Sequence, residues 1–341
     1  MADSSPNKAQ APRQTGAFGT EFISKMAVAE CIDGVWQPAR VVPVAPISLH
    51  PAAHVLHYAS TCFEGMKAYR TPDGHTRVFR LDRHMARFGR SAKQLYLPFP
   101  GEQVVESMVR EMLAECDAEM PEPPKALYLR PTLIGTEANI GAAGAPSRDA
   151  LLYVLGSPVG DYFTGGAKAL TIKVEEEAMR CAPGTGQTKT GGNYAAALRQ
   201  VIEARENEGA DQVLFCPGGD VQETGASNFF LLKDNCLLTK PLAPSFLDGV
   251  TRDSVITVAK DLGYEVREED FTVDDIQDWI KDGEAFLSGT AAVLSGVGYL
   301  LCRGERLVVG DGSMGPHTQK LRQALTDLQF GRVEDRFGWL S

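Results

Sequence analysis

The stretch "GTGQTKTGGNYAA", residues 184–196, places four glycines around Lys189 and sets Tyr194 five residues after that lysine. Glycines beside a Lys-Thr pair suggest the phosphate loop G-x-x-x-x-G-K-S/T, whose backbone amides wrap a phosphate. That pattern needs a glycine directly before the lysine, and Thr188 occupies the position. A nucleotide phosphate loop is therefore disfavoured, which leaves two interpretations: a surface loop with an incidental lysine, or a lysine that does chemistry itself.

A helix is predicted directly after this stretch, over residues 193–208. Leu198, Val201 and Ile202 recur at helical spacing and predict its apolar side, with charged residues on the opposite side. Gly209 follows at the usual C-terminal stop position. The segment is thus expected to be a glycine-rich loop that leads into an amphipathic helix.

Length and charge bound the possible functions. A chain of 341 residues with 43% hydrophobic residues can bury the cores of two domains. Lys and Arg total 34 against 44 Asp and Glu, a net charge of -10, which argues against a nucleic-acid partner. No run of about 18 apolar residues suggests a membrane span. Residues 1–16 lack the apolar core of a secretion signal and are expected to form a disordered tail.

Cysteine and histidine usage predicts neither a disulfide framework nor a metal site. The cysteine count is odd, and no C-x-x-C pair occurs. His54 and His57 lie close together without an H-E-x-x-H pattern, and His57 is interpreted as structural. A reducing cytoplasm is the expected location. The cysteines are Cys31, Cys62, Cys116, Cys181, Cys216, Cys236 and Cys302.

Alternating and helical patterns predict an α+β fold with two domains. In the first half, a hairpin is expected around Asp33-Gly34, and strands over residues 126–135 and 149–158. Two apolar stripes predict helices. Their members are Leu81, Met85, Phe88 and Leu95 in the first, and Val104, Val105, Met108, Val109 and Met112 in the second.

The second half is expected to combine antiparallel hairpins with helices. A strand is predicted within residues 169–183, further strands over 212–216, 221–232 and 236–240, and a helix over 251–263. This pattern counts against a Rossmann dehydrogenase, in which strands and helices alternate. The predicted bounds are 1–16 for the tail, 17–160 for a small N-terminal domain, 161–170 for an interdomain loop and 171–341 for a large C-terminal domain.

If Lys189 is chemical, its most plausible use is a Schiff base with a carbonyl compound. A carbonyl cofactor such as pyridoxal 5'-phosphate would need three further groups. These are a phosphate site, a carboxylate at the pyridine nitrogen and a donor at the ring oxygen.

Motifs along the chain meet these needs. These motifs, quoted below, and "FGTEF" near the start make the chain resemble the branched-chain amino acid aminotransferases. Members of that family are class IV, fold-type-IV pyridoxal-phosphate enzymes. The spacing of "TKTGGNY" and the following "ETGASN" is the most specific part. The remaining motifs, in chain order, are "HYASTCFEGMKAYR", "LYLRPTLIG", "DGVTRD" and "SGTAA".

The resemblance implies a two-domain fold, with a smaller sandwich-like domain and a larger one of hairpins and helices around a pseudo-barrel. It makes Lys189 the residue that holds the cofactor as an aldimine and moves a proton at the substrate α-carbon. Glu223 corresponds to the carboxylate at the pyridine nitrogen, and Tyr194 to the donor at the ring oxygen.

The same resemblance assigns the phosphate to Arg87 and to the backbone amides of Val250 and Thr251 at a helix start. Arg83, Arg87 and Arg90 share one helix face, and the motif selects Arg87 alone. Thr290 is expected to serve both the cofactor and the substrate.

Further residues are implied to bind substrate. Thr290 and Ala291 correspond to the turn that receives the α-carboxylate, and Arg130 to a cation for the side-chain carboxylate of glutamate. The aromatic pocket residues are Tyr58, Phe63, Tyr128 and Tyr162.

The implied activity is reversible transamination of L-leucine, L-isoleucine or L-valine with 2-oxoglutarate, a ping-pong reaction of a homodimer that binds small amino acids and 2-oxo acids. Alternatives are a D-amino acid aminotransferase, an aminodeoxychorismate lyase or a non-catalytic protein that binds the cofactor. Two departures from the family pattern stand out. The interval from Arg180 to Lys189 is short, and the turn at "SGTAA" lacks the C-x-x-C of mammalian members.

Overall fold

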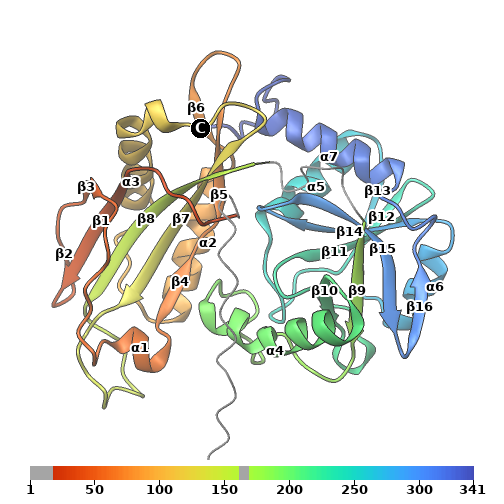
Figure 1. Cartoon of the computed structure of the whole chain (residues 1–341), viewed down its shortest axis with the longest axis horizontal. Helices are drawn as coiled ribbons and strands as arrows, with labels where there is room; N and C mark the ends of the chain where they lie inside the picture. Colours follow the sequence, from red (N-terminus) through yellow and green to blue (C-terminus); the bar gives the residue numbers. More distant parts are fainter. Residues whose placement is uncertain (1–17, 161–168) are drawn as a thin grey trace, which may run out of the picture.

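A computed structural model describes residues 18–160 and 169–341. Two sheets stand side by side, each with helices packed against it (Figure 1). The first is built from strands before residue 160 and the second from strands after residue 169. The predicted tail over residues 1–16 and the predicted pocket residue Tyr162 lie outside the described residues.

The first sheet is antiparallel throughout, in the order β2-β1-β8-β7-β5-β6, with β3 added to β1 and β4 to β7. The predicted hairpin is confirmed, because Asp33 and Gly34 form the turn with positive φ and Ile32 pairs with Val35. The strands are β1 Lys25–Ile32, β2 Val35–Trp36, β3 Arg40–Pro43, β4 Thr61–Phe63, β5 Met66–Arg70, β6 Thr76–Val78, β7 Ala126–Gly135 and β8 Ala150–Val159.

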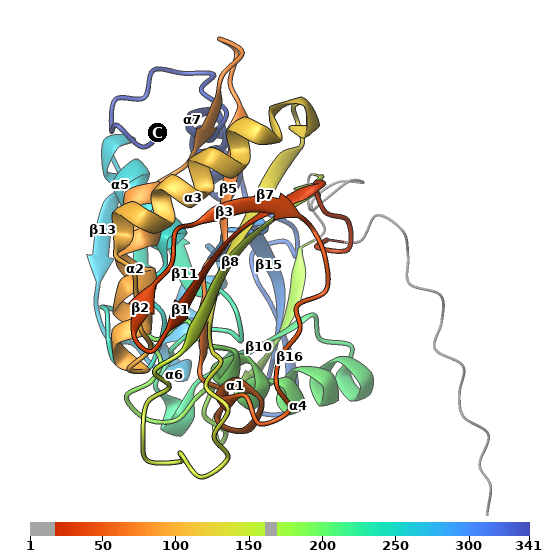
Figure 2. The same ribbon diagram turned by 90° about the vertical axis from the view of Figure 1, so that its left-hand side faces the viewer.

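Two helices, α2 Leu81–Gln94 and α3 Glu102–Glu115, pack on one face of this sheet (Figure 2). Their predicted apolar stripes enter a shared core with the sheet, with one exception. Val104 is 40% exposed, so its assignment to the buried stripe is wrong, whereas its neighbour Val105 is fully buried. The short elements α1 His54–Tyr58 and the 3-10 turn Asp117–Glu119 complete this part.

The second sheet runs in the order β10-β9-β15-β14-β11-β12-β13, with β16 added to β15. Its pairings are mixed, because β9 is parallel to both β10 and β15, and β12 is parallel to β13. The expected antiparallel hairpins are therefore confirmed only for part of the sheet, such as the pair β11 and β12. The strands are β9 Leu170–Glu175, β10 Gln212–Phe215, β11 Asn228–Lys233, β12 Cys236–Thr239, β13 Glu265–Glu268, β14 Glu284–Gly289, β15 Val293–Cys302 and β16 Glu305–Val308.

Helix α4 Gly191–Glu208 begins two residues before the predicted start and ends at Gly209, as predicted. Its buried side consists of Asn193, Ala197 and Ala204, whereas Leu198 is 57% exposed. The predicted apolar side is therefore wrong at Leu198, because this helix packs on β10 through small side chains. The other elements are α5 Val250–Asp261, α6 Val273–Ile280, α7 Pro316–Gln329 and the 3-10 turn Pro217–Gly219.

The end of the chain returns to the first sheet. Val78 and Ser341 exchange backbone hydrogen bonds at 2.9 and 3.1 Å, and Arg80 donates its backbone N–H to the carbonyl of Trp339 at 2.7 Å. The guanidinium of Arg80 also lies 4.5 Å from the centroid of the Trp339 ring. After the strands of the second sheet, the chain therefore returns to the first sheet, where Ser341 pairs with Val78 of β6 (Figure 1).

All seven cysteines are buried and carry free thiols. In the described part of the chain, no cluster of three or more metal-ligating side chains occurs. Nor does any described helix combine the length and apolar character needed to cross a bilayer.

Candidate active site

Seven of the residues predicted for the site line one cavity of about 780 Å³. Its walls come from the first sheet, from the loop before α4 and from the turn between β14 and β15. Segments that lie more than a hundred residues apart in the sequence therefore meet there. The seven residues are Phe63, Tyr128, Arg130, Lys189, Tyr194, Thr290 and Ala291.

The backbone on either side of Lys189 is fixed to the first half of the chain. Its N–H donates to the hydroxyl of Ser91 on α2, and its carbonyl accepts from the N–H of Phe63 on β4, both at 3.0 Å. Its Nζ donates to the hydroxyl of Tyr194 at 2.8 Å and lies 5.0 Å from the centroid of the Phe63 ring. The lysine is thus held in the cavity by residues of both halves.

The short segment before Lys189 has a defined course. The N–H of Gly186 donates to the carbonyl of Pro244 at 2.9 Å, and a Cβ added at Gly186 would lie 2.1 Å from the carbonyl carbon of Ser245. Asn193 donates from Nδ2 to the carbonyls of Thr185 and Thr188, both at 2.9 Å. The segment therefore packs against residues 244–246 and is tied to the first turn of α4.

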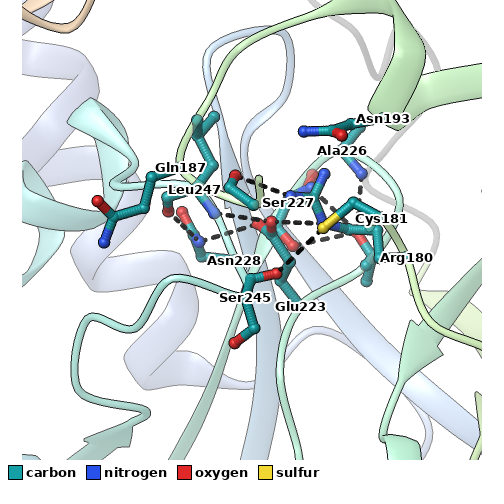
Figure 3. Close-up of polar contacts among 12 residues, drawn as sticks. Arg180, Cys181, Gln187, Asn193, Glu223, Ala226, Ser227, Asn228, Ser245 and Leu247 are labelled. Atoms are coloured by element: carbon teal, nitrogen blue, oxygen red, sulfur yellow. Dashed lines mark hydrogen bonds and ion pairs between the residues drawn. The ribbon is translucent and has the colours of Figure 1, made fainter. Parts of the chain in front are cut away.

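Glu223 is buried, at 3% exposure, with both carboxylate oxygens engaged (Figure 3). Oε1 accepts from the N–H of Leu247 at 2.8 Å, and Oε2 accepts from Nδ2 of Asn228 at 3.1 Å. Nε of Arg180 lies 2.8 Å from Oε1. Burial raises the pKa of Glu223 to about 7, although Arg180 opposes the shift. A cationic partner would keep this acid ionised.

Arg87 is the buried member of the three arginines on α2, with its side chain 4% exposed against 41% for Arg83 and 54% for Arg90. Its Nε and Nη2 donate to the two oxygens of Glu64 at 2.7 and 2.8 Å. The guanidinium also donates from Nη1 to the carbonyl of Asp248 at 2.9 Å. Three of its five N–H donors are thereby used, and two are left for an anion.

The Glu64 carboxylate, which is fully buried, also contacts Nδ1 of His84 at 2.7 Å. Burial opposes ionisation of Glu64, but the Arg87 guanidinium and His84 bring its pKa well below the usual range. Burial lowers the pKa of His84, against the pull of Glu64. We therefore describe Glu64 and Arg87 as a charged pair with a neutral imidazole beside it.

The amino end of α5 lies next to Arg87, because Asp248 directly precedes Gly249, the N-cap residue of this helix. No side chain caps this end, and Val250 and Thr251 present its first backbone N–H groups. A Cβ at Gly249 would lie 2.0 Å from Oδ1 of Asn228, which explains the need for glycine. An uncapped helix start beside an arginine fits a phosphate.

Aromatic and basic groups of the first sheet, on β4 and β7, line another part of the cavity. The Arg130 guanidinium lies 4.6 Å from the centroid of the Phe63 ring, and Nη2 donates to the Tyr128 hydroxyl at 2.9 Å. Nε of Arg130 is buried and has no hydrogen-bond partner within the described residues. A Cβ at Gly65 would lie 1.9 Å from the Tyr128 hydroxyl, so glycine lets this tyrosine enter. This geometry suits a ligand that combines an apolar side chain with a carboxylate.

Tyr58 does not line the cavity of its own chain. It lies on α1, and its hydroxyl donates to the carbonyl of Ile140 in the loop after β7. Arg87, Glu223, Val250 and Thr251 also lie outside the lining, yet the charges of the first two are close enough to contribute to the pKa of Tyr194, which Glu223 raises and Arg87 lowers.

Sequence reasoning missed the residues that hold the predicted ones in place. Glu64 lies between Phe63 and Gly65 in "HYASTCFEGMKAYR" and was not among the predicted site residues. Arg180 and Asn193 fix Glu223 and the loop before Lys189. The available sequence signal was a glutamate inside the run 62–66, which is otherwise free of charge, because an acid that becomes buried is almost always paired; its partners are visible only in the folded chain.

Comparison with known proteins gives a consistent result. The family model for class IV amino-transferases matches residues 61–298 of the chain. A probable branched-chain-amino-acid aminotransferase of Streptomyces coelicolor is 41% identical over 340 residues, which covers 95% of this chain and 91% of the relative. Branched-chain-amino-acid aminotransferase 2 of Bacillus subtilis is 38% identical over 332 residues, with 95% and 91% covered.

Solved structures are similar over nearly the same extent. The branched-chain amino acid aminotransferase of Escherichia coli aligns with a TM-score of 0.76 at 28% identity, covering 94% of this chain and 99% of that one. A crystal structure of another branched-chain amino acid aminotransferase, with pyridoxamine 5'-phosphate, aligns with a TM-score of 0.76 at 29% identity, covering 92% and 97%.

Proposed function

The chain belongs to the class IV aminotransferases, and we propose that it catalyses reversible transfer of the amino group of L-leucine, L-isoleucine or L-valine to 2-oxoglutarate. The names of its relatives support this substrate class. The observation that carries the proposal is the joint placement of Lys189, Tyr194 and Arg130 in one cavity with an aromatic wall.

The enzyme uses pyridoxal 5'-phosphate, which when bound supplies a reactive carbonyl carbon and an electron-accepting ring. The residues present fit this group. The two remaining donors of Arg87 and the uncapped start of α5 at Val250 and Thr251 suit its phosphate. The buried carboxylate of Glu223 suits a protonated ring nitrogen, and the Tyr194 hydroxyl suits the ring oxygen.

Nζ of Lys189 is proposed to be the atom that would hold the cofactor covalently. As a neutral amine, the same Nζ would move a proton from and to the substrate α-carbon. The backbone hydrogen bonds of Lys189 to Ser91 and Phe63 would keep the residue in one place in both roles of Nζ. Before the cofactor is bound, the Tyr194 hydroxyl accepts a hydrogen bond of 2.8 Å from Nζ and so holds it in the cavity. The same nitrogen can therefore serve as anchor and as base.

The substrate side of the cavity explains how one site can take two kinds of substrate. Phe63 and Tyr128 offer apolar surface to a branched side chain, and Arg130 offers a cation to the second carboxylate of glutamate or 2-oxoglutarate. The turn at Thr290 and Ala291 is proposed to receive the α-carboxylate that both substrates share.

The test is an amino-donor panel with 2-oxoglutarate, followed by formation of glutamate and of the 2-oxo acid. We expect leucine, isoleucine and valine to be the preferred donors, and Lys189→Ala to lose at least about 10⁴-fold in kcat/KM. Lys173→Ala is the control, since Lys173 pairs with Glu208 on the surface. Transfer from D-alanine without transfer from leucine would favour the D-amino acid aminotransferase alternative.

A homodimer is the proposed assembly. Three exposed apolar side chains support it: Leu56 on α1, Ile140 in the loop after β7 and Leu198 on α4, each 57–65% exposed. Helices α1 and α4 lie close together at the same end of the molecule in both views (Figures 1 and 2). The carbonyl of Ile140 is bound by Tyr58, so loop and α1 form one surface. A second copy would cover this surface.

Sedimentation equilibrium tests the dimer. Leu198→Glu is expected to shift the holoenzyme toward monomer, whereas Val333→Glu, exposed near the end of the chain, should leave the dimer intact. Equal masses for both variants and the parent would contradict this interface. A cytoplasmic location is proposed because seven free thiols suit a reducing compartment.

A further inference from the structure

Arg180 is a buried cation of the site to which the proposed function gives no role. Its side chain is 4% exposed, and it stands shortly before the segment that leads to Lys189. Nε lies 2.8 Å from Oε1 of Glu223 (Figure 3), and Nη2 donates to the carbonyl of Gly186 at 2.9 Å. One guanidinium thus contacts both the carboxylate assigned to the ring nitrogen and the loop that carries the lysine.

The contact between Arg180 and Glu223 is one of charge. Nε of Arg180 is buried and makes no aligned hydrogen bond within the described residues, although Oε1 lies 2.8 Å away. A guanidinium keeps its proton in proteins, so this positive charge is permanent. Burial raises the pKa of Glu223, and the Arg180 charge is the largest influence that lowers it.

Two other cations act on Glu223 less strongly. Both Lys189 and Arg87 lower its pKa, by less than Arg180 does. The charge of Arg87 is already matched by the carboxylate of Glu64 at 2.7 Å. Nζ of Lys189 is the atom proposed to hold the cofactor. Arg180 is therefore the cation whose charge is left to Glu223.

The neutral groups around Glu223 favour its ionised form as well. Leu247 donates its N–H to Oε1, and Nδ2 of Asn228 donates to Oε2 at 3.1 Å (Figure 3). Among the described residues, every hydrogen-bond partner of this carboxylate is thus a donor. A carboxylate oxygen can accept two hydrogen bonds, so Oε2 has one site left for a further donor.

We propose that Arg180 is a positioning residue that decides where the proton lies between Glu223 and the ring nitrogen of the bound cofactor. In a buried site a carboxylic acid beside a neutral pyridine is favoured over two charges, because burial penalises the charged forms. The Arg180 charge stabilises the carboxylate, so the proton goes to the ring nitrogen. A protonated ring is the stronger electron acceptor, which favours proton removal at the substrate α-carbon.

The second contact of Arg180 keeps its charge in place. Nη2 holds the carbonyl of Gly186, and the N–H of Gly186 donates to the carbonyl of Pro244 at 2.9 Å. Leu247, which donates to Glu223, follows three residues later. Segment 244–247 therefore positions both the guanidinium and the carboxylate, so the charge stays beside Oε1.

Nuclear magnetic resonance of the holoenzyme, with cofactor isotopically labelled at the ring nitrogen, tests the position of the proton. We expect a protonated ring nitrogen in the parent. Arg180→Gln should move the resonance toward that of a neutral pyridine, whereas Arg180→Lys keeps the charge and should stay near the parent. Arg80→Gln is the control, because Arg80 is also buried and paired, with Asp253 at 2.6 Å, and its loss should leave the resonance unchanged.

Two results of this experiment would overturn the proposal. A neutral ring nitrogen in the parent is one, and equal resonances in the parent and in Arg180→Gln are the other. A resonance that moves equally in Arg180→Gln and in Arg180→Lys would refute the role of charge, because only one of these variants lacks it.

A second measurement serves if Arg180→Gln retains too little cofactor. In the cofactor-free enzyme the infrared band of protonated Glu223 is isolated by subtracting the spectrum of the matching Glu223→Gln variant. Arg180→Gln should keep this band to a higher pH than the parent, because the cation that favours the carboxylate is gone. The other ionisable neighbours, Lys189, Arg87 and Tyr194, are the same in both enzymes. Loss of the band at the same pH in both would contradict the proposal.

Kinetics extend the test to the reaction, and this part rests on the proposed function. Arg180→Gln should lower kcat with leucine at least tenfold with little change in KM, and Arg180→Lys should recover most of the loss. If leucine is not a substrate while the resonance depends on the Arg180 charge, the proposed function fails and the role of Arg180 stands. If the parent uses leucine and the resonance is independent of Arg180, the role fails and the proposed function stands.

Discussion

Nζ of Lys189 and the hydroxyl of Tyr194 are joined by a hydrogen bond of 2.8 Å, from the loop to the first turn of the helix that follows it. Burial opposes ionisation of this phenol, but the adjacent lysine charge outweighs it and lowers the pKa of Tyr194. The two side chains therefore form a hydrogen-bonded pair in the cavity, in which the lysine charge favours the phenolate form of Tyr194.

The first prediction concerns this pair in the cofactor-free enzyme. Lys189→Met should raise the pKa of Tyr194, because the ammonium that favours the phenolate is gone while burial remains. The measurement is an ultraviolet titration of tyrosinate, with Tyr194→Phe subtracted to isolate one tyrosine among nine. Lys173→Met is the control and should leave the titration unchanged. An identical Tyr194 titration with and without Lys189 would refute the coupling.

The second prediction follows from the pKa of Glu223, raised by burial to about 7 from an ordinary 4.5. Between these values the folded chain retains a proton that the unfolded chain releases. This contribution to stability is fully present below pH 4.5 and is lost as the pH rises to 7, by up to about 3 kcal/mol. Glu223→Gln removes that dependence in the cofactor-free enzyme.

Urea unfolding at several pH values checks this expectation. The difference in unfolding free energy between Glu223→Gln and the parent should move in favour of the variant from pH 4.5 to 7 and stay level above. Groups other than Glu223 cancel in that difference. A difference that does not vary with pH would mean that Arg180 keeps Glu223 ionised throughout.

A third prediction concerns Glu64. Glu64→Gln leaves the Arg87 guanidinium buried without its counter-charge, and breaking a buried pair in this way costs about 3–5 kcal/mol. Cofactor affinity should fall at least tenfold, because Arg87 also loses the bidentate contact that orients it. Urea unfolding and fluorescence titration with cofactor measure the two effects. Glu106→Gln, from an exposed pair with Arg110, should change stability by less than about 0.5 kcal/mol.

The fourth prediction separates two glycines near Lys189. Gly186→Ala would force a Cβ against the backbone of Ser245, at 2.1 Å, so stability should fall by about 1–3 kcal/mol and activity should fall with it. Gly192→Ala meets nothing within 4 Å and should be tolerated. Thermal unfolding and leucine transamination compare the two variants. Equal behaviour would show that residues 184–188 do not pack as described.

A fifth prediction tests how the site distinguishes its substrates. Arg130→Met removes the cation with the unpaired buried Nε, so kcat/KM for 2-oxoglutarate should fall by about 10–100-fold. The leucine half-reaction should change much less, because its side chain carries no second carboxylate. Single-turnover kinetics with each substrate alone measure the two halves. Equal losses in both would assign Arg130 to the shared α-carboxylate or to the fold.

The reactive residues were predictable because short motifs fix them. Lys189 and Tyr194 stand five residues apart in one stretch, and Glu223 lies in a second motif about thirty residues later. The meeting of Lys189, Tyr194 and Arg130 in one cavity was implied only by resemblance. No periodic pattern in the sequence brings the first sheet to the loop before α4.

The missed features have physical causes. Leu198 and Val104 fit a helical apolar stripe, yet both are exposed, because neighbouring small or fully apolar side chains make the contact with the sheet. The parallel pairing of β9 with β10 and β15 depends on long crossovers that local patterns do not reveal. The Glu64 pair forms with residues twenty or more positions away, so only the folded chain shows it.

The return of the chain to β6 affects how the molecule can move. The two halves of the chain are joined where the chain passes from β8 to β9, where Phe63 donates to the carbonyl of Lys189, and where Ser341 pairs with Val78. Two parts that are joined at several separate places cannot rotate apart about a single linker without breaking the backbone hydrogen bonds at the other places. We therefore expect substrates to enter by local rearrangement around the cavity, with the two sheets acting as one rigid frame.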